Sequence, residues 1–235
     1  MCTVTFIPFE SNTFILTSNR DEAPGRETLP PEKYKVDNVE LLFPKDKVAG
    51  GSWIGVSEKK RLICLLNGGF TAHERAESYR MSRGIIVTEF LTSNDVEASI
   101  KKFDFKGIEP FTIILVQWQR HLQLHELVWD GNKAHFTEKS LIPHIWSSSL
   151  LYSQAMKDKR ENWFESFLKK TKKPSEKELL MFHKTAGDTN LESRLVMDRG
   201  FVKTKSITQV VYNDNNELKM RYEDLQQNTI TQNTF

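Results

Sequence analysis

Segments with the pattern of β-strands occur in this chain in runs, and helical segments form separate runs between them. Alternation of apolar and polar residues begins the sequence, helical spacing follows, and the same order repeats before two closing strands. Segregated runs are typical of antiparallel sheets covered by helices, whereas regular strand-helix alternation would indicate a parallel sheet. We therefore expect an α+β fold. The expected strands cover residues 2–7, 14–17, 50–57, 61–66, 111–117, 121–129, 134–139, 206–212 and 218–222, and the expected helices cover 77–91, 95–102, 150–170 and 175–185.

The segments outside these elements set the expected domain limits. Residues 27–47 are polar and rich in proline, so we interpret them as a long surface loop. Residues 226–235 are polar, and we expect them to form a flexible tail. Because no Gly/Ser-rich linker or internal repeat interrupts the rest, we expect one domain over residues 1–225.

The charge balance excludes several classes of partner. The 33 Lys and Arg residues nearly cancel the 31 Asp and Glu residues, and no run of five or six like charges occurs. We therefore expect no nucleic-acid partner. No apolar stretch approaches the roughly 20 residues that a spanning helix needs, so we expect no membrane insertion and a cytoplasmic location. The sequence does not indicate an oligomeric state.

The sequence does not suggest a metal or another cofactor. The two cysteines, Cys2 and Cys64, have no neighbouring Cys or His at the spacing of a metal site. His121 and His125 share a face of an expected strand, but a third ligand is not evident. Cys64 lies in an apolar strand and is interpreted as an inert core thiol.

Cys2 directly follows Met1, at the head of the first expected strand. Removal of Met1 would place a thiol and a free α-amine on one residue, with reference pKa values of about 8.5 and about 7.7–8.0. The amine can then accept the thiol proton near neutral pH, which makes Cys2 a candidate N-terminal nucleophile. The alternative is that Cys2 is a small apolar residue that opens a buried strand.

Polar residues end the second expected strand, where residues 18–22 read SNRDE. Alternation places Asn19 and Asp21 on one face of the strand and Arg20 on the other. Asp21 is suited to orient an amine, and Arg20 is suited to favour a thiolate that lies close to it. The alternative is that Asp21 and Arg20 form a structural salt bridge.

Asn67 ends another expected strand and is followed by Gly68 and Gly69. Its side-chain amide is suited to donate to a developing oxyanion, and the glycines let backbone approach a ligand. The alternative is that these three residues only make a turn. Trp53, in the preceding hairpin, is interpreted either as a core residue or as part of the mouth of a pocket.

Five short stretches of the chain, taken together, form a pattern specific enough to compare with known families. They are MCTVTF at residues 1–6, SNRDE at 18–22 with Arg26 shortly after it, GGSWIGVS at 50–57, the strand that ends in Asn67, and SRG at 82–84. Taken together they resemble the NRDE family, also called the transport-and-Golgi-organisation family. The resemblance is dense over residues 1–92 and thin after them.

The NRDE family is similar to the N-terminal-nucleophile hydrolases, in particular to Cys-type acylases such as penicillin V acylase and conjugated bile-acid hydrolases. The resemblance implies a four-layer αββα sandwich and acyl transfer, most simply hydrolysis of a small amide. It implies that Cys2 is the nucleophile, that Asp21 holds the α-amine and that Asn67 helps to bind the oxyanion. The implied partner is a small acyl substrate.

The chain departs from the acylase pattern at three positions. Arg20 is shifted by two places from the Arg of the acylases. Ser148 aligns loosely with an Asn of many relatives, and Lys205 stands where the family tends to have Arg. Ser148 and Lys205 are therefore candidate substrate-binding residues, together with Asn19, Trp53 and Gly68.

These departures also fit a second function. A non-catalytic binding or trafficking protein would keep the same pocket for a hydrophobic ligand such as a lipid or haem. The family name, with its links to Golgi organisation, lipid balance and haem movement, favours this class. The two functions differ in one observable, because a catalyst requires the removal of Met1 and a binder does not.

Overall fold

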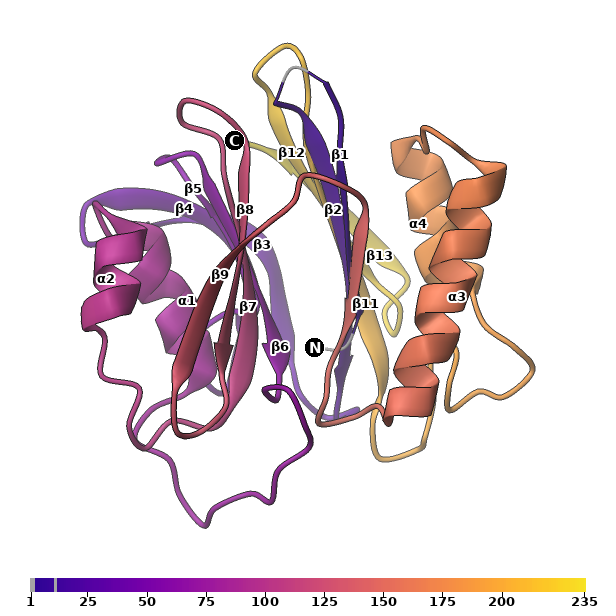
Figure 1. Cartoon of the computed structure of the whole chain (residues 1–235), viewed down its shortest axis with the longest axis horizontal. Helices are drawn as coiled ribbons and strands as arrows, with labels where there is room; N and C mark the ends of the chain where they lie inside the picture. Colours follow the sequence, from indigo (N-terminus) through magenta and orange to yellow (C-terminus); the bar gives the residue numbers. More distant parts are fainter. Residues whose placement is uncertain (1–2, 11) are drawn as a thin grey trace. The chain divides into compact units, whose positions relative to one another are not determined.

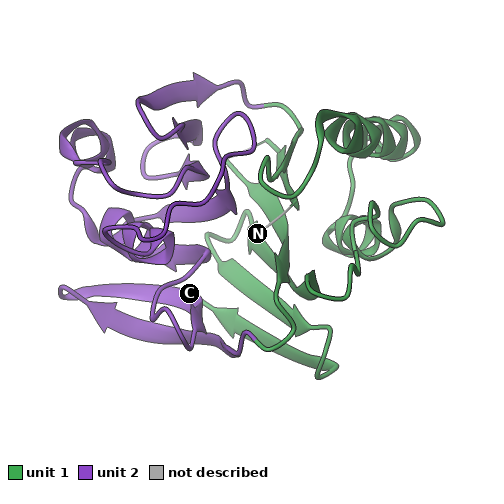
Figure 2. Ribbon diagram, turned by 90° about the horizontal axis from the view of Figure 1, so that it is seen from below, with its two compact units in different colours: residues 1–25, 142–235 green, residues 26–141 purple. Residues whose placement is uncertain are grey.

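The computed structural model describes residues 3–10 and 12–235 of the chain. The chain divides into two compact units, one of residues 1–25 and 142–235 and one of residues 26–141, coloured green and purple in Figure 2. The chain therefore starts in the first unit, builds the whole second unit and returns to complete the first. Cys2 lies outside the described residues, so its role stays a prediction.

The first unit is a six-stranded antiparallel sheet with two helices on one face (Figure 1). The strand order is β10-β1-β2-β11-β12-β13. The elements are β1 (Thr3–Pro8), β2 (Phe14–Glu22), β10 (His144–Ser147), α3 (Gln154–Lys170), α4 (Glu176–Thr185), β11 (Lys203–Tyr212), β12 (Leu218–Asp224) and β13 (Thr229–Thr234).

The first hairpin forms where the sequence predicts it. Thr3 pairs with Asn19 and Pro8 pairs with Phe14, so residues of β1 and β2 that lie opposite each other share a face of the sheet. Near the hairpin turn the helix-facing side is apolar, and there Ile7 and Ile15 belong to a buried cluster with residues of α3 and α4. Toward the start of β1 the same side becomes polar.

The second unit is a seven-stranded antiparallel sheet whose strands follow one another in sequence order. Helices α1 and α2 belong to the same buried cluster as this sheet, which includes Ile86 and Phe90 from α1 and Ile100 from α2. The elements are β3 (Thr28–Val36), β4 (Val39–Asp46), β5 (Ile54–Ser57), β6 (Arg61–Asn67), α1 (Arg83–Thr92), α2 (Val96–Lys102), β7 (Phe111–Gln117), β8 (Gln123–Trp129) and β9 (Ala134–Lys139).

The helices begin at side-chain caps. Ser175 caps α4 and forms a capping box with Glu178, as the Ser-x-x-Glu spacing predicts. Helix α2 is capped by Asp95, whose side chain accepts a hydrogen bond from the Ala98 backbone N–H. Helix α1 begins at Arg83, six residues later than its expected start, because Ser82 supplies its N-cap.

Two expectations about irregular segments were wrong. Most of residues 27–47, expected to be a surface loop, form the paired strands β3 and β4. Residues 229–234, expected to belong to a flexible tail, form β13 and pair with β12. The short strand β10 was not expected. The prediction of one domain over residues 1–225 stays a prediction.

The α+β class is confirmed, because each unit combines one antiparallel sheet with two helices. Within the described residues, no helix has both the length and the apolar character needed to cross a bilayer.

Candidate active site

The helix-facing side at the end of β2 holds Asp21 in a fixed position. The Asp21 side chain is 2% exposed. Its Oδ2 accepts a hydrogen bond from the Tyr152 hydroxyl at 2.5 Å, and its Oδ1 accepts one from the Thr204 hydroxyl at 2.5 Å. Hydroxyl donors to a carboxylate make short, strong bonds, so these two contacts fix the orientation of the Asp21 carboxylate.

A buried guanidinium lies over the ring of Tyr152, whose hydroxyl donates to this carboxylate. Arg160 of α3 is fully buried, and its Nη1 donates to the Thr3 hydroxyl at 2.6 Å. Its Nε and Nη2 donate to the carbonyl oxygens of Ser193 and Arg194. The guanidinium lies 3.4 Å from the centroid of the Tyr152 ring. Among the described residues, this buried cation has only neutral hydrogen-bond acceptors. Tyr152 contacts the guanidinium through its ring and the Asp21 carboxylate through its hydroxyl.

His183 of α4 completes the polar network. Its Nδ1 lies 2.5 Å from Asn19 Oδ1 and its Nε2 lies 2.7 Å from the Thr5 hydroxyl. Burial, with a further contribution from the positive charge of Arg160, lowers the pKa of His183 to about 3. The ring is therefore neutral at pH 7. Because Asn19 Oδ1 is an acceptor, Nδ1 carries the ring proton and Nε2 accepts the hydrogen bond from Thr5.

Both the oxygen and the nitrogen of the Asn19 side-chain amide make hydrogen bonds within this network. Its Nδ2 donates to the carbonyl oxygens of His183 and Leu195, and it is 0% exposed. Both donor hydrogens of the amide are thus used within the protein. The predicted contact of Asn19 with substrate stays a prediction, and this geometry favours a positioning role instead.

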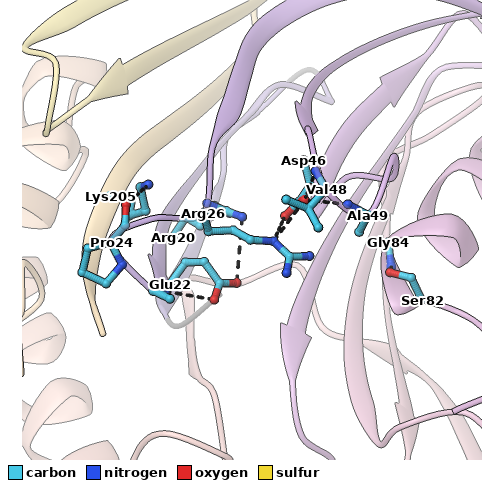
Figure 3. Close-up of polar contacts among 11 residues, drawn as sticks. Arg20, Glu22, Pro24, Arg26, Asp46, Val48, Ala49, Ser82, Gly84 and Lys205 are labelled. Carbon is cyan, nitrogen blue, oxygen red and sulfur yellow. Dashed lines mark hydrogen bonds and ion pairs between the residues drawn. The ribbon is translucent and has the colours of Figure 1, made fainter. Parts of the chain in front are cut away.

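The opposite face at the end of β2 carries Arg20, as the alternation predicts. Arg20 is 3% exposed, and its Nη2 lies 3.9 Å from Glu22 Oε2. Figure 3 shows Arg20, Glu22 and Lys205 gathered near Pro24 at this strand end. The alternative pairing of Arg20 with Asp21 stays a prediction, and the two residues project from opposite faces of β2.

Lys205 occupies an irregularity in β11. The register shifts between Thr204 and Ser206, so Lys205 is the extra residue of a β-bulge, a device that redirects a side chain. Its Nζ donates to the Pro24 carbonyl at 2.7 Å. Burial lowers the pKa of Lys205, and the nearby Arg20 charge lowers it further, while Asp224 and Glu22 oppose this shift.

Two hydroxyls on the Arg20 face lack hydrogen-bond partners among the described residues. Ser206 pairs with Arg20 and Thr208 pairs with Ser18, so both side chains share the face of Arg20. Both are fully buried, and neither hydroxyl has a hydrogen-bond partner there.

Ser148, another predicted site residue, is 1% exposed, and its carbonyl accepts the Tyr152 backbone N–H at 3.1 Å.

The second unit holds Asn67, Gly68 and Trp53. Asn67 ends β6 and is partly exposed, and Gly68 follows with a φ of 89°, a left-handed conformation that favours glycine. Trp53 is 5% exposed and precedes β5. The burial of Trp53 agrees with the core alternative, and the roles proposed for Asn67 and Gly68 stay predictions.

Two of the short motifs of the second unit have structural roles. Arg26 Nε lies 2.9 Å from Asp46 Oδ2, and Asp46 Oδ1 accepts the backbone N–H groups of Val48 and Ala49 (Figure 3). In GGSWIGVS, a Cβ on Gly51 would lie 2.4 Å from the carbonyl carbon of Gly84. The glycines of GGSW and SRG therefore let the start of α1 approach the backbone of the segment before β5 directly.

Three basic residues of the second unit gather around one carboxylate. His73, Arg75 and Arg83 all lie within ion-pair distance of Glu109, with Arg83 Nη2 at 2.9 Å. Cys64 is fully buried in β6, as expected. Among the described residues, no group of three or more His, Cys, Asp or Glu side chains is placed to hold a metal ion.

Sequence reasoning missed Tyr152, Arg160 and His183. Arg160 and His183 lie in α3 and α4, and Tyr152 lies just before α3, so polar or charged character is their only sequence signal. Each lies more than 130 residues from its partner in β1 or β2. Local periodicity does not reveal such pairs.

Comparison with solved structures defines the fold of the chain. A variant of conjugated bile acid hydrolase from Clostridium perfringens matches with a TM-score of 0.60 and 9% identity, covering 99% of this chain and 92% of that one. Penicillin V acylase from Agrobacterium tumefaciens matches with a TM-score of 0.55 and 9% identity, covering 98% and 85%. An orthologue of N-acylethanolamine-hydrolyzing acid amidase from Caenorhabditis elegans matches with a TM-score of 0.60 and 11% identity, covering 88% and 92%. The chain thus has the N-terminal-nucleophile hydrolase fold that the resemblance implied.

The sequence comparison then identifies the family. Residues 1–227 match the family described as Transport and Golgi organisation 2, and the chain belongs to that family. A search of curated protein sequences gave no match.

Proposed function

We propose that this protein carries out acyl transfer through an N-terminal Cys2, with hydrolysis of a small amide as the simplest outcome. The Cys2 thiol gives its proton to its own α-amine, and the sulfur bonds to the substrate carbonyl carbon. The C–N bond then breaks, and the leaving amine takes the proton back. Water adds to the thioester and breaks the C–S bond, which releases the carboxylic acid and restores the thiol.

The observation that carries this proposal is the buried polar face at the end of β2. Arg20 shares it with the hydroxyls of Ser206 and Thr208, which lack partners among the described residues. A buried hydroxyl without a partner costs roughly 1–3 kcal/mol, so a polar ligand that bonds these groups would be favoured. Thr3, the residue that follows Cys2 in the chain, pairs with the residue before Arg20.

The anchoring of Asp21 gives a further argument. A carboxylate that orients an α-amine must itself be held rigidly, and the two hydroxyl donors of Tyr152 and Thr204 hold it. Bile acid hydrolase, penicillin V acylase and the acid amidase, which share this fold, are named for hydrolysis or acyl chemistry. We propose a substrate of that class for this chain.

The same Asp21 contacts also favour a second candidate, a non-catalytic binding protein. Both carboxylate oxygens already have donors, so Asp21 needs no amine to satisfy it. The family description refers to transport rather than to catalysis. In this case the polar face beside Arg20 would hold a ligand, such as a lipid or haem, without turning it over.

The first experiment determines the N-terminus and the reactivity of Cys2. Intact mass and N-terminal sequencing establish whether Met1 is removed. The protein is then treated with a panel of activated acyl esters, and the modified residue is identified by peptide mass. We expect loss of Met1 and an acyl adduct on Cys2 that disappears in Cys2→Ala. Cys64→Ala is the matched control, because Cys64 is a fully buried thiol, and it should leave the adduct unchanged.

The outcomes separate the two candidates. A retained Met1 together with an unreactive Cys2 would exclude the hydrolase and leave the binding protein. If the adduct forms, Asp21→Asn and Asn67→Ala test the two predicted supporting roles in the same assay. Loss of one oxyanion donor typically lowers the rate about 10²- to 10³-fold, which is the effect expected for Asn67→Ala.

A further inference from the structure

The first unit contains a cavity that involves none of the predicted site residues. It has a volume of about 420 Å³ and is lined by one side of α4 and by the strands β11, β12 and β13. A cavity of this size is in the range of small-molecule sites. We call it the α4 groove.

One wall of the groove is apolar, and part of it comes from residues of α4 that lie outside the buried cluster. Leu179 and Phe182 of α4 pack into the buried cluster of the first unit. Leu180 and Met181 instead line the groove, and Val211 of β11, a member of the same buried cluster, also lines it. Met181 is 51% exposed, so α4 presents apolar surface away from its core-facing side.

The other wall carries an excess of positive charge. Glu223 of β12 is 4% exposed, and both of its oxygens bind cations. Its Oε2 lies 2.5 Å from Lys184 Nζ, and its Oε1 lies 2.7 Å from Arg221 Nη2. Two cations therefore share one carboxylate, which leaves this triad with a net charge of +1.

The remaining charges of the groove do not cancel this excess. Lys219 pairs with Glu217 at 3.1 Å, and Lys177 and Glu176 are neighbours at the start of α4, so each of these pairs sums to zero. Lys184 uses one of its three N–H donors in the triad, and Arg221 Nη1 makes no hydrogen bond to the described residues. Donors thus remain at the cationic wall.

We propose that the α4 groove binds a small organic anion: a carboxylate, sulfonate or phosphate ester joined to a short apolar group. The anionic head bonds Arg221 and Lys184 and neutralises the charge of the triad. The apolar group lies against Leu180, Met181 and Val211. Charge-assisted bonds to Arg orient such a head, and burial of the apolar group adds affinity.

The test uses the full chain, labelled with ¹⁵N, and amide NMR shifts during titration. The probes are hexanoate, hexanesulfonate and monohexyl phosphate, which share the apolar group and differ in the head. Hexylammonium reverses the charge, and acetate removes the apolar group. We expect saturable shifts in α4, β11 and β12 for at least one hexyl anion, with at least tenfold weaker binding of hexylammonium and of acetate.

Two substitutions test the charge argument. Arg221→Gln and Lys184→Gln each bring the triad to zero charge and leave Glu223 with one cation, so the fold is expected to persist. Each should weaken binding of the best hexyl anion about tenfold. Lys169→Gln, which removes an exposed charge from α3, is the control and should bind like the wild type.

The wild-type titrations keep the proposal falsifiable even if a variant does not fold. Shifts that map outside the groove, equal binding of hexylammonium, or no saturable shift with any hexyl anion would each overturn it. Binding that is unchanged in both folded variants would also overturn it. None of these results depends on Cys2, so a failure of the proposed acyl transfer leaves this inference untouched.

Discussion

At the scale of single residues, the neutral ring of His183 makes folding sensitive to acid. Its pKa is about 3 in the folded state and about 6.5 when unfolded, so between these values only the unfolded chain binds the proton. Stability is unaffected by this group above pH 6.5 and falls as the pH drops below it. The loss reaches about 1.4 kcal/mol per pH unit, or about 2 kcal/mol at pH 5.

The variant His183→Gln tests this expectation in urea unfolding at a series of pH values. At pH 8 it should be less stable than the wild type by about 1–3 kcal/mol, because Thr5 and Asn19 lose a buried partner. The difference between the two proteins should shrink as the pH falls from 6.5 to 5. The exposed His121→Gln is the control for loss of an imidazole. A difference that stays constant with pH would contradict the assignment of a buried neutral ring.

Tyr152 is the second residue whose removal should have a defined effect. Tyr152→Phe keeps the ring under the Arg160 guanidinium and deletes the hydroxyl that donates to Asp21. Hydrogen bonds to charged groups contribute about 1.5–3 kcal/mol, so the free energy of unfolding should fall by about that amount. Tyr79→Phe removes a hydroxyl near the surface and should change it by less than about 0.5 kcal/mol. Equal effects of the two substitutions would show that the Asp21 bond does not stabilise the fold.

At the scale of elements, the contact between the GGSW segment and α1 depends on the absence of a side chain. A methyl group on Gly51 would lie 2.4 Å from Gly84 backbone, so Gly51→Ala must push the start of α1 away from the sheet. We expect a loss of about 1–3 kcal/mol in urea unfolding. Gly25→Ala is the matched control, since nothing lies within 4 Å of its added methyl group, and it should be neutral or slightly stabilising. A neutral Gly51→Ala would refute the close approach.

The prolines of β3 account for the incorrect prediction of a loop over residues 27–47. Pro30 and Pro31 suggest a break, but β3 is an edge strand, and its register shifts between Leu29 and Glu32. Proline is tolerated at an edge and at a bulge, because no ladder hydrogen bond is lost there. Its presence therefore argues against a central strand rather than against any strand. The regular strands at 61–66 and 111–117 were predicted closely, because both are nearly continuous apolar runs without proline.

At the scale of the whole molecule, the sequence predicted which residues share a strand face but not what covers them. Alternation placed Asn19 and Asp21 together and Arg20 opposite, and the hydrogen bonds agree. The groups that hold them, Tyr152, His183 of α4 and Thr204 of β11, all follow the second unit in the chain. Since a pattern within one segment carries no information on such distant pairs, the buried network around Arg160 needed three-dimensional structure.

The last strand gives a prediction for the molecule as a whole. β13 pairs with β12 from Thr229 to Thr234 and forms one edge of the six-stranded sheet. Truncation after Leu225 removes this strand and exposes the backbone N–H and C=O groups of β12, and an unpaired edge favours pairing with another chain. We therefore expect the truncated protein to unfold at a lower temperature, by roughly 2–4 °C for each kcal/mol lost, and to self-associate.

Differential scanning calorimetry and sedimentation velocity measure the two effects of this truncation. Ile230→Thr in the full chain is the matched control. Its side chain is 56% exposed, and threonine keeps both the β-branched shape and the ladder of β13. This variant should keep the wild-type Tm and association state. A truncated protein with an unchanged Tm and no new association would mean that β12 does not need β13 as its neighbour, and that residues 226–235 behave as the tail that their composition suggests.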